Sequence, residues 1–116
     1  MASAVANRYA AALADVLYKP SAAQTPASAA TELRAFAGVL AGSAELRNVF
    51  ATPAVATGRK RELAGDLAAR LEFGPAVRNL LLVLVDHGRM GALGEIAEAY
   101  AAELDRRSGV ARIRVA

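Results

Sequence analysis

Residues 75–88, PAVRNLLLVLVDHG, decide the fold of this chain of 116 residues. A proline opens the stretch and a glycine ends it, as is typical of a helix with well-defined ends. One face of such a helix carries four apolar side chains, and another face, beside Asn79 and Asp86, carries two more. The first face consists of Val77, Leu80, Leu81 and Leu84, and the second of Leu82 and Val83. Because both faces require burial, this helix is predicted to lie at the centre of a helical protein.

The part of the chain before this stretch begins with three predicted helices. Apolar residues at helical spacing mark the first of them over residues 2–18. Thr25 and Pro26 supply a cap and a first helical residue for the second, which Gly42 ends. Ser43 is placed to cap a short third helix.

Two more helices complete the predicted set. A fourth is expected after a turn at Thr57 and Gly58, because leucines then recur every four residues. These leucines are Leu63, Leu67 and Leu71. A sixth is expected from residue 91 or 92 to residue 108. Alanine, which favours helices, is the commonest residue, and only 5% of residues are aromatic. The fold class is therefore all-α, a six-helix bundle formed by residues 1–108.

The last residues change pattern. Residues 110–115 alternate apolar and basic side chains with a period of two, which is typical of a strand. A single strand has no sheet to join, and its exposed edge would invite pairing with other chains. Residues 109–116 are therefore expected to be the start of a linker and first strand that lead into a C-terminal domain absent from this sequence.

Composition bears on several classes of function. Without cysteine there is no disulfide, thiolate metal site or thiol nucleophile. The longest apolar run, residues 80–85, is far shorter than the roughly 20 residues that span a bilayer, so direct membrane insertion is not expected. The net charge of +3 is too small to indicate nucleic acid on its own. No residues have the spacing of metal ligands or of a phosphate loop, so no cofactor is expected.

Two polar clusters leave alternatives open. The basic residues 59–61 could contact phosphates, and the first alternative is therefore a basic helical RNA-binding bundle of the antitermination type. Aromatic side chains are absent nearby, however, and Glu62 and Asp66 follow at once, so nucleic acid is not the expected partner. The second alternative is a small hydrolase that uses His87 with Asp86. Neighbours near a helix end do not converge on one point, so the chain is not expected to be an enzyme.

The first predicted helix carries more apolar surface than one core contact needs. By helix geometry its apolar arc is wider than the roughly 100° of one core face. The arc consists of Val5, Tyr9, Ala12, Leu13 and Leu17. If this helix lies beside the helix of residues 75–86, their outer faces form a groove for an amphipathic helix of a partner. The small side chain of Ala12 would let that helix approach closely.

Two segments also resemble a known family. ANRYAAAL at residues 6–13 and RNLLLVLVDHGRMGAL at residues 78–93 are similar to signatures of the delta subunit of rotary, F-type ATP synthases. The mitochondrial counterpart is the oligomycin-sensitivity-conferring protein. The resemblance covers nearly the whole chain, including ATPAV at residues 51–55, and GVARIRVA at residues 109–116 is similar to the family's crossing into its second domain. The chain departs from the family at His87, where Asn is more usual, and at Ala14, where a bulky residue often stands.

The resemblance implies a non-catalytic adaptor of the peripheral stalk, or stator. Its six-helix N-terminal domain would bind the N-terminal helix of an alpha subunit of the catalytic head, between the first and fifth helices. The missing C-terminal domain would bind the b subunits. The protein would be a peripheral membrane protein at the cytoplasmic face of the bacterial cell membrane. The candidate partner-binding residues are Arg8, Tyr9, Ala12, Val16, Asn79, Leu82, Val83 and Asp86.

Overall fold

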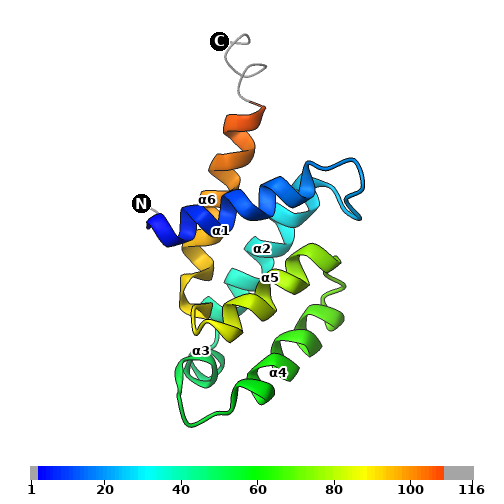
Figure 1. Cartoon of the computed structure of the whole chain (residues 1–116). Helices are drawn as coiled ribbons and strands as arrows, with labels where there is room; N and C mark the ends of the chain where they lie inside the picture. Colours follow the sequence, from blue (N-terminus) through cyan, green and yellow to red (C-terminus); the bar gives the residue numbers. More distant parts are fainter. Residues whose placement is uncertain (1–2, 109–116) are drawn as a thin grey trace.

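The computed structural model describes residues 3–108, which form six α-helices and one short 3₁₀ helix (Figure 1). The elements are α1 (Ala4–Leu17), α2 (Pro26–Ala41), α3 (Ala44–Ala51), α4 (Thr57–Arg70), α5 (Pro75–Asp86), η1 (Met90–Ala92) and α6 (Leu93–Arg107). The prediction of an all-α, six-helix fold is confirmed. The predicted strand over residues 110–115 and the predicted boundary at residue 109 lie outside the described residues.

Side-chain caps begin the first three helices. The hydroxyl groups of Ser3, Thr25 and Ser43 each accept a hydrogen bond from the backbone N–H three residues further on. The caps predicted at Thr25 and Ser43 are therefore confirmed. At the end of α5, Gly88 adopts the left-handed region with φ +65°, where a side chain would be strained. This glycine stops the helix and turns the chain toward η1 and α6.

Helix α4 differs from the prediction in two respects. It begins at Thr57, so the turn predicted at Thr57 and Gly58 is wrong. Its buried residues are Ala64 and Ala68, whereas Leu71, the last of the three regularly spaced leucines, is 40% exposed. Residues spaced by four turn through roughly 400°, so each leucine lies about 40° further round the helix than the last. The row of leucines therefore drifts away from the buried side, which the two alanines occupy.

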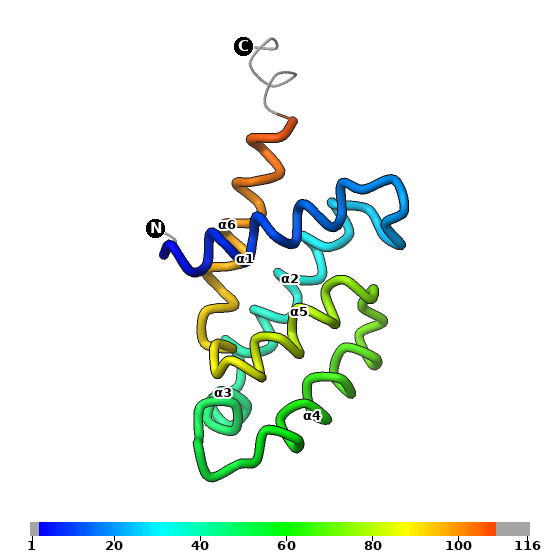
Figure 2. Tube along the Cα trace, in the orientation of Figure 1, coloured from blue at the N-terminus to red at the C-terminus, as the bar shows by residue number. Residues whose placement is uncertain are grey.

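The core lies where α6 packs against α1 and α2, and where α5 packs against α1, α2 and α4 (Figures 1 and 2). The largest fully buried side chains are Tyr100, Phe36, Leu33, Leu81, Leu84, Leu93, Ile96 and Val77. The core face predicted for α5 is buried as expected. The buried hydroxyl of Tyr100 donates a hydrogen bond to the carbonyl of Pro26 at 2.8 Å, which ties α6 to the start of α2.

A second polar contact holds the start of α5. The backbone N–H of Gly74 donates to both carboxylate oxygens of Glu32 in α2, at 3.1 Å each. The amide of Gln24 also donates to Glu32, at 3.2 Å. A side chain at residue 74 would collide with Gln24, because a Cβ built there lies 2.3 Å from its Oε1. The glycine therefore lets the segment before α2 pack tightly against the start of α5.

Candidate partner-binding surface

The apolar arc of α1 is shared between the core and the surface. Leu13 and Leu17 are buried in the core, whereas Tyr9 is half-buried and packs against its edge. Val16 is 47% exposed, and Ala12 is also exposed. Helix α1 therefore keeps apolar surface that the core does not use.

Helix α5 shows the same division. Of the two apolar residues predicted to lie outside its main core face, Leu82 is half-buried against the core and Val83 is 40% exposed. Asn79 and Asp86 are exposed on the same helix. Val83 is therefore the outward apolar residue of α5, a distinction that the sequence pattern did not make.

The two helices are neighbours. Helices α1 and α5 contact each other, and Figure 1 shows α1 crossing in front of α6 and α5 crossing in front of α2. We use the name α1–α5 surface for the eight candidate residues that these helices carry. They are Arg8, Tyr9, Ala12, Val16, Asn79, Leu82, Val83 and Asp86.

The polar members of the α1–α5 surface differ in their surroundings. Asp86 accepts a hydrogen bond from Arg61 of α4, with 2.6 Å between Oδ2 and Nη1. Within residues 3–108, the exposed side chains of Arg8 and Asn79 make no hydrogen bond or ion pair. Asp86 is thus engaged within the domain, whereas Arg8 and Asn79 keep their polar groups for water or a partner.

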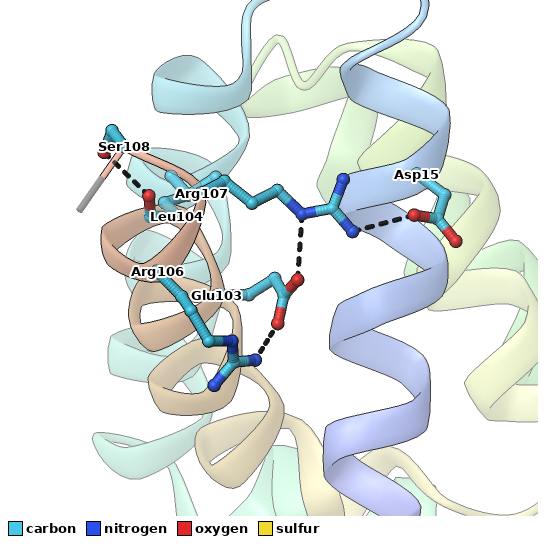
Figure 3. Close-up of polar contacts among 6 residues, drawn as sticks. All are labelled: Asp15, Glu103, Leu104, Arg106, Arg107 and Ser108. Atoms are coloured by element: carbon cyan, nitrogen blue, oxygen red, sulfur yellow. Dashed lines mark hydrogen bonds and ion pairs between the residues drawn. The ribbon is translucent and has the colours of Figure 1, made fainter. Parts of the chain in front are cut away.

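A charged network fixes the end of α1 that carries Val16 (Figure 3). The guanidinium of Arg107 in α6 donates to Asp15 at 2.7 Å and to Glu103 at 2.8 Å. Arg107 also lies over the ring of Tyr18, 5.1 Å from its centroid. The hydrogen bond from Arg107 is the largest cause that lowers the pKa of Glu103, and Arg106 adds to it. The network therefore ties the last turn of α1 to the end of α6.

This network was not predicted from the sequence. Glu103 and Arg107 have the i, i+4 spacing of a helical ion pair, which is a readable signal. Asp15 is 92 residues from Arg107, and nothing local joins the two. Only the packing of α1 on α6 brings them together.

The two alternative functions, hydrolysis and RNA binding, rested on His87 with Asp86 and on the basic residues 59–61. His87 is exposed at the end of α5, while the carboxylate of its neighbour Asp86 pairs with Arg61. In the basic run, Arg59 lies 3.7 Å from Glu62. Two of the three basic side chains therefore face a carboxylate. Residues 3–108 contain no group of three or more potential metal ligands, and none of the helices described is long and apolar enough to cross a membrane.

The fold and the α1–α5 surface together define the class of protein. It is a small all-α domain with apolar side chains exposed on two adjacent helices. Residues 5–116 match the family model of the ATP synthase delta (OSCP) subunit, and the chain belongs to that family. It is 42% identical to the ATP synthase subunit delta of Geobacter sp. (strain M21) over 110 residues, 95% of this chain and 59% of that protein.

Relatives of lower identity are also ATP synthase delta subunits. The chain is 38% identical to ATP synthase subunit delta of Geobacter metallireducens over 112 residues, which cover 97% of this chain and 61% of that protein. With the counterpart in Acidobacterium capsulatum it shares 33% identity over 114 residues, 97% of this chain and 62% of that protein. The chain therefore spans about three fifths of the length of these relatives.

Proposed function

We propose that this chain is a non-catalytic adaptor of a rotary ATP synthase that holds the catalytic head to the stator. Its α1–α5 surface binds the N-terminal helix of an alpha subunit. The complex lies at the cytoplasmic face of the bacterial membrane, where the adaptor is a peripheral component. A C-terminal domain of the longer protein binds the b subunits. The exposure of Val16 and Val83 on two adjacent helices is the observation that carries the proposal.

A helical partner suits this surface. An amphipathic helix lays its apolar side in a groove and keeps its polar side in water. Val16 and Val83 supply apolar contacts, and the exposed small residue Ala12 allows a close approach. Arg8 and Asn79 supply charge and hydrogen bonds at the edge, where polar groups set orientation more than affinity.

The first test is calorimetric titration of the domain with a synthetic peptide that covers the N-terminal helix of the cognate alpha subunit. We expect saturable binding with a negative heat-capacity change, because apolar surface leaves water. Affinity should change little between low and high salt. A steep loss of affinity with salt would instead point to charge contacts, as in RNA binding, and would contradict the apolar groove.

A pair of matched variants locates the site. Val83→Asp places a carboxylate in the α1–α5 surface, where a bound helix would remove it from water, so binding should weaken more than roughly tenfold. Leu71→Asp is the control, because Leu71 is also 40% exposed but lies after α4. Both variants should keep the circular dichroism spectrum of the parent. If they weaken binding equally, or if Val83→Asp binds like the parent, the site is elsewhere.

A further inference from the structure

A cavity of about 680 Å³ lies away from the α1–α5 surface, between α2, α3 and the start of α6. This volume falls in the range of roughly 300–1,000 Å³ that is typical of small-ligand pockets. Leu40, Phe50 and Met90 line it, and each is buried among the core residues. Most of the remaining lining residues are alanine or glycine. The cavity is thus largely apolar, and its small lining residues leave room for a ligand.

The charged residues that line this cavity are both basic, Arg47 and Lys60. Arg47 uses Nη1 to bond the carbonyls of Leu40 and Ala41, at 2.7 Å each, which fixes its guanidinium at the rim. Lys60 lies in the first turn of α4, whose N-terminus has no side-chain cap. The positive end of the helix dipole adds to its charge. An anionic group at the rim would therefore be favoured over a cationic one.

A second hollow, of about 490 Å³, continues the first along α2 and α6. The two hollows share the lining residues Ala37, Ala41 and Gly94. Alanines form most of the second hollow, with Arg34 and Glu98 among its lining. The two hollows therefore adjoin along α2 and α6, and together we call them the channel; Arg47 and Lys60 line the first hollow, and Arg34 and Glu98 line the second.

We propose that this channel binds an amphiphilic anion, an unbranched apolar chain that carries one carboxylate or phosphate head. The chain lies along α2 and α6, and the head meets Lys60 and the free donors of Arg47. Charge complementarity selects the head, and the alanine-lined second hollow accepts the apolar tail. This site shares no residue with the α1–α5 surface, so it stands or falls independently of the proposed function.

The probes are dodecanoate, below its micelle-forming concentration, and dodecyltrimethylammonium, which has the same tail and the opposite charge. Calorimetry should show saturable binding of one dodecanoate per chain and much weaker binding of the cation. Equal binding of both probes would overturn the assignment of the basic rim. The absence of saturable dodecanoate binding would overturn the proposal as a whole.

Two variants with matched controls test the location. Gly94→Leu places a side chain at a residue that lines both hollows, where a Cβ meets nothing within 4 Å. It should abolish saturable binding, whereas Gly38→Leu, equally open but outside both hollows, should not. Lys60→Gln should weaken dodecanoate binding roughly two- to fivefold, as expected for one exposed ion pair. Lys19→Gln makes the same charge change outside the cavity and should have no effect.

The source of the anion is tested with vesicles. Binding of the parent, but not of Gly94→Leu, to phosphatidylglycerol vesicles would identify the head group as that of a membrane lipid. Binding of free dodecanoate without vesicle binding would identify a soluble amphiphile. Vesicle or dodecanoate binding that survives in Gly94→Leu would show that the channel is not the site, provided that circular dichroism shows the variant folded.

Discussion

Replacing Tyr100 by Phe should produce a domain that is less stable than the parent at neutral pH and more stable at high pH. The Tyr100 side chain is fully buried, and its hydroxyl donates to the Pro26 carbonyl at 2.8 Å. Burial, with a smaller contribution from Tyr18, raises the pKa of Tyr100 from 10.0 to about 12, against a lowering by Arg107. The folded state therefore favours the neutral form of the Tyr100 phenol over its ionised form.

The magnitude follows from two opposing effects. At neutral pH the variant lacks one buried hydrogen bond, which costs about 1 kcal/mol. Because the folded pKa of Tyr100 is raised, its contribution to the free energy of unfolding is full below pH 10 and is lost as the pH rises toward 12. A shift of about two pKa units corresponds to about 2 to 3 kcal/mol. The two stability curves should therefore cross at about pH 10.7.

Urea unfolding followed by circular dichroism, at pH values from 7 to 11.5, measures both curves. Lysine deprotonation affects the parent and the variant alike and cancels in their difference. Tyr9→Phe is the control, because it removes a phenol that is not among the groups that shift the pKa of Tyr100, and its stability should follow that of the parent. Parallel curves for Tyr100→Phe and the parent would refute the claim that the fold disfavours the ionised phenol.

Three further substitutions test local features. Glu72 adopts φ 58°, so Glu72→Gly should raise the free energy of unfolding by up to about 1 kcal/mol in thermal denaturation. Gly88→Ala should lower it by about 1 kcal/mol, because the left-handed turn after α5 then carries a Cβ. Arg107→Gln removes the partner of Asp15 and should speed amide hydrogen exchange in the last turn of α1. Arg106→Gln leaves that pair intact, and equal exchange in both variants would contradict the role given to the network.

The fold was predictable wherever the signal is local. A hydroxyl before a helix, as at Thr25 and Ser43, caps that helix whatever it later packs against. A glycine can end α5 at Gly88 for the same reason. The buried side of α4 is different, because it depends on which neighbour the helix meets. Leucine spacing suggested one side, and contact with α5 selected the side that carries Ala64 and Ala68.

The candidate surface was predictable only in outline. The pattern of α5 separated Leu82 and Val83 from the main core face, but a helix offers a continuous range of directions. The angle at which α5 meets its neighbours therefore decided that Leu82 is half-buried and Val83 exposed. The pairing of Asp86 with Arg61 could not be read from the sequence either, because the two residues lie on different helices.

Helix α1 is held against α6 at both of its ends. At the beginning, the backbone N–H of Ser3 donates to Glu95 at 2.9 Å. At the end, Asp15 accepts from Arg107 at 2.7 Å. Both anchors come from α6, which is not part of the α1–α5 surface. The orientation of α1 is therefore set before any partner arrives.

Helix α5 is fixed in the same way by other helices. Glu32 of α2 accepts the N–H of Gly74 at its start, and Arg61 of α4 pairs with Asp86 at its end. This geometry gives Asp86 a positioning role within the domain, whether or not it also contacts a partner. A surface whose two helices are already fixed has less freedom to lose on binding, since ordering a loose side chain costs about 0.5 to 1.5 kcal/mol. If the α1–α5 surface binds a helix as proposed, little of the binding energy gained at Val16 and Val83 is therefore spent on ordering the domain.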